Sequence, residues 1–325
     1  LSNNDSGGTG GTDSTSANTV LGYLAGANIA SGGLNNSVFG HKAGNAITTG
    51  DENVSVGALA LDANQTGGSN VAVGASAAGA FIGSYAVAIG REALRDANHA
   101  SDANGTVAIG TGSLAAVTSG AGNIGIGFQA GDALTTGVRN IAIGYTAFST
   151  SINSSGDSIA IGYNAMNGSG TSAASEKNIA IGNYTMNGNQ NDSDFNIAVG
   201  HQALNALTLG DRNTVVGSQS GLVLTSGGYN TILGGGAGKV TTDVDNAVMI
   251  GYGACADGAL DNNADGTVAI GYDALKALTT GAGNVAIGYA AMDAMQEGHN
   301  NIAIGENAFG TANNSGTDRN IAIGS

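Results

Sequence analysis

The sequence predicts an all-β protein, a parallel β-solenoid of about eighteen coils with 16–20 residues in each. The first observation behind this prediction is a five-residue pattern, Asn-Ile-Ala-Ile-Gly at residues 140–144, which recurs in variant form eighteen times along the chain. The second is its spacing of 16 to 20 residues, most often 17, because a fixed period of this size is typical of stacked repeats. We call the last residue of each pattern its closing glycine and name each coil by it; the coil includes the residues that follow this glycine, up to the next pattern. The closing glycines are 22, 40, 57, 74, 90, 110, 127, 144, 162, 182, 200, 217, 234, 251, 271, 288, 305 and 324.

Alternate residues of each expected strand point to opposite faces. The residue before the closing glycine is apolar in all eighteen copies, and the residue three before it is Val or Ile in fourteen. We expect these two positions, such as Ile141 and Ile143, to form the buried core. The residue between them is Ala, Gly or Ser in thirteen copies, and we expect this small face to pack against the second segment of the same coil or a neighbouring subunit. The contact should differ where the face carries larger residues, at Val215, Ile232 and Met249.

The rest of each coil also follows a pattern. Asn stands four residues before the glycine in thirteen copies, which predicts an asparagine ladder in which each amide bonds the next. The glycine is expected to adopt a conformation that other residues avoid. Three residues after it stands Ala, Ser or Thr, usually followed by an apolar residue, and these two positions predict a second inward-facing segment. Cys255 falls in the second of these slots, so we expect a buried thiol.

The chain also carries a longer duplication. Residues 40–57 align with residues 200–217, and residues 105–110 align with residues 266–271, a shift of about nine coils. We therefore expect two continuous super-repeats, residues 1–162 and 163–325, with residues 1–22 as an irregular coil.

Composition argues against several classes of partner. The net charge is −15, only 10% of residues are charged, and no basic patch occurs, so we expect no nucleic-acid binding. No apolar run approaches the length of a membrane span, so we expect no membrane insertion.

The motif Asn-(Ile/Val)-Ala-(Ile/Val)-Gly, with Ala three residues later, resembles the head repeats of trimeric autotransporter adhesins, the YadA-like heads. The match is cleanest at residues 104–148, 178–203 and 266–308, and bacteriophage tail fibres contain similar repeats. The resemblance implies a left-handed β-roll that forms a homotrimer and is displayed outside the cell, or on the virion in a tail fibre. The coils of this chain are longer than the compact adhesin repeat, and the sequence shows neither a coiled-coil stalk nor a membrane anchor.

The sequence offers no set of acid, base and nucleophile, so we expect no enzymatic activity, catalytic residue, cofactor or metal. His41 and His201 occupy equivalent positions that the duplication explains, whereas His99 and His299 follow no such pattern. Two long coils carry acidic loops that could ligate calcium, but their spacing matches neither the EF-hand nor the nonapeptide calcium motif and favours solvated loops. The residues in these loops are Asp96, Asp102 and Asn104, and Asp257, Asp261 and Asp265.

Six tyrosines immediately follow a closing glycine, so they are expected to stack along one edge. We favour edge packing over a sugar-binding stripe for this set. Its members are Tyr23, Tyr145, Tyr163, Tyr252, Tyr272 and Tyr289.

These features predict a non-enzymatic extracellular structural fibre or adhesin module that extends from a surface and assembles or binds through its repeat faces. A bacteriophage tail-fibre shaft is one alternative, and an ice-binding solenoid, suggested by threonine-rich turns, is another. Expected partners are further copies of the chain, with a host surface or glycans as candidates. Copies could form the homotrimer that the resemblance implies or a head-to-tail filament in which residues 1–22 stack on residues 320–325 of another chain. Alternatively, the repeat continues covalently beyond these residues.

Overall fold

The computed structural model describes residues 2–3, 17–95, 103–150, 156–168, 175–310 and 317–325. Its regular elements are short strands and a single turn of 3-10 helix, η1 (Asn262–Ala264), within the described residues. The strands are β1 (Ser2–Asn3), β2 (Thr19–Leu21), β3 (Ser37–Phe39), β4 (Val54–Val56), β5 (Val71–Val73), β6 (Val87–Ile89), β7 (Val107–Ile109), β8 (Ile124–Ile126), β9 (Ile141–Ile143), β10 (Ile159–Ile161), β11 (Ile179–Ile181), β12 (Ile197–Val199), β13 (Thr214–Val216), β14 (Thr231–Leu233), β15 (Val248–Ile250), β16 (Val268–Ile270), β17 (Val285–Ile287), β18 (Ile302–Ile304) and β19 (Ile321–Ile323).

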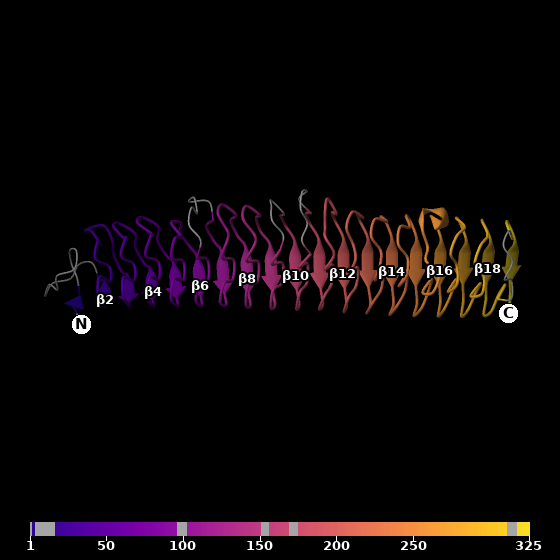
Figure 1. The fold of residues 1–325 in the computed structure, drawn as a ribbon, viewed down its shortest axis with the longest axis horizontal. Helices are drawn as coiled ribbons and strands as arrows, with labels where there is room; N and C mark the ends of the chain where they lie inside the picture. Colours follow the sequence, from indigo (N-terminus) through magenta and orange to yellow (C-terminus); the bar gives the residue numbers. More distant parts are fainter. Residues whose placement is uncertain (1, 4–16, 96–102, 151–155, 169–174, 311–316) are drawn as a thin grey trace. The chain divides into compact units, whose positions relative to one another are not determined.

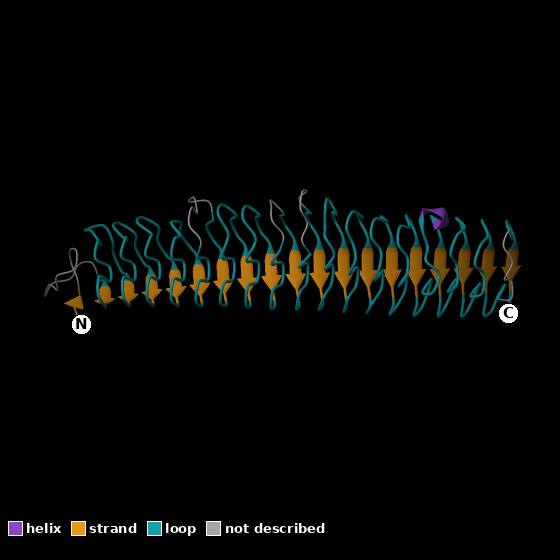
Figure 2. Ribbon diagram, viewed as in Figure 1, coloured by secondary structure: helices purple, strands orange, loops and turns teal. Residues whose placement is uncertain are grey.

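The chain divides into two compact units, Leu1–Ala160 and Ile161–Ser325, and β10 spans their boundary. In the first unit, β1 pairs antiparallel with β2, and the strands from β2 to β9 each pair in parallel with the next. In the second unit, the strands from β11 to β19 do the same (Figure 1). Every strand from β2 to β19 ends just before a closing glycine, and the other described residues of the coils form turns, loops and η1 (Figure 2). The prediction of an all-β parallel β-solenoid is confirmed.

Successive strands pair without any shift in register. Val107 lies opposite Ile124, Ala108 opposite Gly125, and Ile109 opposite Ile126. Equivalent positions of neighbouring coils therefore stack on one another within each unit. We call such a stack of equivalent residues a column.

The predicted assignment of the two strand faces is wrong. Ala142, in the middle of β9, is fully buried, whereas Ile141 and Ile143 are only partly covered. The same holds along both units: Ile89 of the first unit keeps 39% of its surface exposed, and Ile304 of the second keeps 38%. The small residue points into the coil, and the two β-branched residues point outward, where they contact their neighbours in the column.

The narrow interior of the coil explains this reversal. Within coil 40, a Cβ built on Gly44 would lie 3.4 Å from Cγ1 of Val38, so the second segment lies directly against the inner side of the strand. Of the two partners expected for the small face, the structure therefore shows the second segment of the coils. The second segment points inward as predicted, with Ala147 and Phe148 buried in coil 144.

Side-chain sizes compensate each other inside a coil. Where the middle strand residue is large, as at Ile232, the residue four after the closing glycine is small, as at Gly238, whose built Cβ would lie 3.4 Å from Ile232 Cδ1. Where the middle residue is Ala, the residue four after the glycine is large in most coils, as with Ala198 and Leu204, but coil 74 carries Ala72 and Ala78. The larger residues expected to alter an external contact are fully buried instead. Val215 and Ile232 lie against Gly221 and Gly238 of their own coils, whereas Sδ of Met249 lies 2.8 Å from a Cβ built on Gly238 of the preceding coil.

Coil 127 has glycine at both positions, Gly125 and Gly131. Leu114 of the preceding coil fills the space between them: a built Cβ on either glycine would lie 2.6 Å from a Leu114 carbon. Compensation here crosses from one coil to the next.

The predicted asparagine ladder is present and buried. The backbone N–H of Asn213 donates to Oδ1 of Asn196 at 2.9 Å, and its Nδ2 donates to the same oxygen at 3.0 Å. Nδ2 also donates to the carbonyl of Gly227 at 2.9 Å, so the side chain joins the strand to the turn of the next coil. Buried amides require such partners, and here they come from adjacent coils.

The closing glycines adopt the special conformation that was predicted. Their φ angles lie between +124° and +145°, a region that is essentially restricted to glycine. A Cβ on Gly74 would lie 2.6 Å from the carbonyl oxygen of Gly90, so close stacking of coils also excludes a side chain.

Candidate binding site

Tyrosines stack at the corner that follows the strands of the second unit. Tyr252, Tyr272 and Tyr289 each come directly after a closing glycine, and parallel pairing of β15, β16 and β17 places them in one column. The Tyr252 and Tyr272 rings lie 5.6 Å apart at an interplanar angle of 16°, and the Tyr272 and Tyr289 rings lie 5.2 Å apart at 8°. The expected edge stacking is confirmed for these three residues.

The stack stops at a gap made by glycines. The preceding residue of the column is Gly235, and a Cβ built on it would lie 3.5 Å from Cδ2 and 3.7 Å from Cε2 of Tyr252. That side of the Tyr252 ring is therefore left uncovered by its column neighbour. Gly236 and Gly253 leave the adjoining column without side chains, and a Cβ built on Gly236 would meet nothing within 4 Å.

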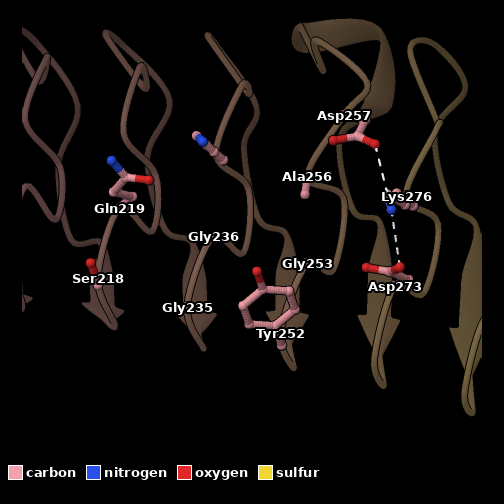
Figure 3. A pocket seen from close by; sticks show the side chains of 11 residues that line it. Ser218, Gln219, Gly235, Gly236, Tyr252, Gly253, Ala256, Asp257, Asp273 and Lys276 are labelled. Carbon is pink, nitrogen blue, oxygen red and sulfur yellow. Dashed lines mark hydrogen bonds and ion pairs between the residues drawn. The ribbon is translucent and has the colours of Figure 1, made fainter.

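The result is a hollow of about 350 Å³ that lies entirely within the second unit (Figure 3). Its residues are Ser218, Gln219, Gly235, Gly236, Lys239, Tyr252, Gly253, Ala256, Asp257, Asp273 and Lys276.

Polar side chains form two walls of this hollow. On one side, Nε2 of Gln219 donates to Oε1 of Gln202 at 3.1 Å, which holds the Gln219 amide in place. On the other, Nζ of Lys276 lies 3.0 Å from Asp273 and 3.7 Å from Asp257 (Figure 3). The hydrogen bond and negative charge of Asp273 raise the pKa of Lys276, so this side chain stays cationic near neutral pH.

The first unit has different residues at the positions related by the duplication. Ala75 corresponds to Gly235, and Arg91 corresponds to Tyr252. Arg91 and Glu92 form an ion pair at 3.2 Å. Elsewhere in that unit, Phe128 stacks on Tyr145 at 5.0 Å. The exposed tyrosine ring beside a gap of glycines is therefore present in the second unit and not at the corresponding positions of the first.

The sequence reasoning missed the hollow, although its signal was visible. Gly234-Gly235-Gly236 is the only place where three glycines are consecutive, and Gly253 removes the equivalent side chain one coil later. Aligning the coils at their closing glycines would have placed this gap beside Tyr252.

The structure does not bring the described acidic residues of the long coils into one cluster. Asp257 pairs with Lys276, Asp261 accepts a hydrogen bond from the Asn263 amide, and Asp265 accepts one from the Asp245 amide. Asp96 and Asp102 lie outside the described residues, while Asn104 accepts a hydrogen bond from the Ser84 amide. Among the described residues, no group of three His, Cys, Asp or Glu side chains is arranged to hold a metal ion.

The described histidines serve as local packing and hydrogen-bonding groups. His41 stacks on Tyr23 at 5.6 Å, and His201 meets Tyr184 edge-on at 6.3 Å. Nδ1 of His299 accepts a hydrogen bond from the Ala282 amide. His99 lies outside the described part of the chain.

Cys255 is fully buried as predicted, and burial raises its pKa to about 12.

Comparisons with known proteins give no match: no family model, curated protein or solved structure is similar to this chain. Within the described residues, no helix has the length and apolar character needed to cross a bilayer.

Proposed function

We propose that this chain is a non-enzymatic structural module of an extracellular fibre or adhesin, and that copies of it associate through the outer face of their strands. The observation that carries this proposal is the outer strand face, defined as the residues one and three before each closing glycine. Most of them are Ile or Val, and within each unit they follow one another in register.

The residues of this face are more exposed to solvent than the residues inside the coils. Val216 keeps 40% of its surface exposed, Ile287 36% and Ile89 39%, whereas the inward residues between such positions are fully buried. Extended apolar patches of this kind usually mark contact surfaces, because covering them removes apolar area from water. Association with copies of the same chain is favoured because a regular apolar column can pack against an identical column.

The homotrimer implied by the resemblance to YadA-like heads is the assembly that we propose. In solution, its mass would be three times 31.4 kDa. Light scattering over a range of protein concentrations measures this directly. A chain that stays monomeric at the highest accessible concentration would contradict the proposal.

Variants of the face make the test specific. The triple variant Ile109→Thr, Ile126→Thr and Ile143→Thr keeps β-branched residues on three consecutive strands but makes the outer face polar. We expect it to dissociate while keeping its β-sheet circular dichroism. Ile82→Thr is the single-site control, since Ile82 is 45% exposed in the loop that precedes β6 and is not part of the outer strand face. If the control and the triple variant have the same mass as the unmodified chain, the outer face is not the interface.

A bacteriophage tail-fibre shaft remains the main alternative, since the same face would serve assembly there. Identifying the neighbouring gene product, a membrane anchor or a fibre chaperone, separates these two locations.

The ice-binding alternative rested on threonine-rich turns. In the structure, Oγ1 of Thr208 and Thr225 donates to the carbonyl of the next coil at 2.8 and 2.9 Å. These hydroxyls connect coils, so they give no support to an ice-binding array, and an ice recrystallisation assay tests it.

A further inference from the structure

We propose that the hollow beside Tyr252 is a saccharide-binding site that takes one uncharged hexopyranose ring of a glycan, stacked on the tyrosine. This inference rests on the proposed role as an adhesin module and assigns a ligand site to it. The site is separate from the outer strand face, so the two proposals can fail independently.

The free side of the Tyr252 ring is the first argument. Tyr272, the next residue of the column, is covered on both sides by the rings of Tyr252 and Tyr289. Tyr252 has a glycine next to it on one side, and 65% of its surface is exposed. The carbon-bound hydrogens on one side of a pyranose ring form a flat apolar surface. Such a surface matches an exposed aromatic ring that has an apolar body and a polar hydroxyl.

The polar groups at both ends of the gap are the second argument. The Gln219 amide contains a donor and an acceptor, the carboxylates of Asp257 and Asp273 accept, and the Lys276 ammonium donates. Sugar hydroxyls need both kinds of partner, because each can donate and accept. A few fixed polar groups around an aromatic platform are the usual composition of a small-molecule site.

Charge favours a neutral ligand. Lys239 and Lys276 are balanced by Asp257 and Asp273, so the lining has no net charge. The chain as a whole carries a formal charge of −15, which disfavours acidic glycans and nucleotides. An uncharged hexose avoids this repulsion and still satisfies the polar walls.

Size and rigidity are consistent with one ring. The volume of about 350 Å³ lies at the lower end of the range for ligand sites, roughly 300–1,000 Å³. The ion pairs of Lys276 and the hydrogen bond between Gln219 and Gln202 hold the walls, so binding would order few side chains. The exposed position of Tyr252 lets the remainder of a glycan continue into solvent.

The direct test uses methyl α- and β-glycosides of glucose, galactose and mannose as probes, with binding followed by saturation-transfer NMR. We expect at least one of them to bind through its ring hydrogens. Tyr252→Ala should lower the affinity by about tenfold or more, since it removes the stacking surface. Tyr252→Phe should retain most binding, because the ring remains.

Gly235→Tyr is the sharper variant, since it should extend the tyrosine stack into the hollow and block it. The built Cβ at position 235 makes only ordinary contacts with Tyr252, and its φ is not left-handed, so the variant should fold. Tyr289→Ala is the control, because it alters the same stack at the end away from the hollow. Unchanged circular dichroism and melting temperature verify folding of each variant.

Two outcomes would overturn the proposal: no glycoside binds, or Gly235→Tyr binds as well as the unmodified chain. Binding of N-acetyltyrosinamide in the absence of sugar binding would overturn it too, and would indicate a protein partner whose aromatic side chain completes the stack. In each case, light scattering of the same variants reports self-association separately. An unchanged oligomer mass with lost sugar binding shows that the ligand site and the assembly face are distinct.

Discussion

Replacing Gly221 by Leu tests the size compensation inside the coils. Gly221 faces Val215 within coil 217, and a built Cβ would lie 3.1 Å from Cδ2 of Leu204, 3.5 Å from Cδ1 of Ile232 and 3.8 Å from Cγ1 of Val215. One carbon nearly fits, but the three further carbons of leucine have no room. Overpacking of this kind costs about 1–3 kcal/mol. The left-handed φ of +54° adds about 1–2 kcal/mol. We therefore expect a loss of about 2–5 kcal/mol.

The compensating change is Val215→Ala. Alone, it removes two buried methyl groups and leaves a cavity, which should cost about 1.5–3 kcal/mol. Together, the two substitutions give coil 217 the pair found in the preceding coil, where Ala198 accompanies Leu204, a leucine at φ +48°. The double variant should therefore be more stable than Gly221→Leu alone, with a favourable coupling of about 1–3 kcal/mol.

Urea unfolding followed by far-ultraviolet circular dichroism measures all four proteins of this cycle. The midpoint should fall for both single variants and recover in the double variant relative to Gly221→Leu. Strictly additive losses would refute the compensation, because they would mean that residues 215 and 221 do not share one space.

Four further predictions follow from the fold and its buried groups. Ala142→Asp should lower the melting temperature much more than Ile143→Asp, because only the first places a charge inside the coil; the opposite order would contradict the face assignment. Gly74→Ala should cost at least about 1–3 kcal/mol through backbone strain, measured by urea unfolding, and an unchanged midpoint would speak against the tight corner. Cys255, with its pKa of about 12 and full burial, should not react with a thiol reagent until the chain is unfolded, and rapid labelling of the native chain would disprove its burial. Burial raises the pKa of Asp132 from 3.8 to about 6, so ionisation of this carboxyl favours the unfolded chain, and stability should fall as the pH rises between these two values. Asp132→Asn should make the melting temperature depend less on pH in this range, and the same pH dependence in both proteins would contradict this role of Asp132.

Sequence periodicity alone predicted the coil boundaries, the glycine corners and the asparagine ladder. These features depend on backbone geometry and on hydrogen bonds that recur from coil to coil, although the ladder position is Asn in only thirteen of the eighteen copies. Periodicity could not show which strand face points into the coil, because both faces are apolar and the alternation only divides the residues between the two faces. Ile143 and Ala142 were assigned by hydrophobicity, whereas the structure assigns them by the width of the interior. Comparing the middle strand residue with the residue four after each glycine, as in Ile232 and Gly238, would have revealed the true inner pair.

The candidate site was beyond the sequence reasoning for a different reason. Tyr252 was grouped with five other tyrosines because it shares their position in the repeat. Its distinguishing property is the missing side chain of Gly235 in the adjacent coil, and this emerges only when the coils are placed in register. Departures from a repeat are informative when they coincide in space, as Gly235, Gly236 and Gly253 do.

The pairing of large and small side chains within single coils bears on how a chain of this kind can change its length. A coil that balances its own interior volume can be lost or gained by recombination without creating a void in its neighbours. Coils that share interior space differ: Leu114 of coil 110 occupies the space left by Gly125 and Gly131, and Sδ of Met249 lies 2.8 Å from a Cβ built on Gly238 of the preceding coil. Recombination that separates either pair of coils would open a cavity on one side and overpack the other, so we expect each pair to be inherited together.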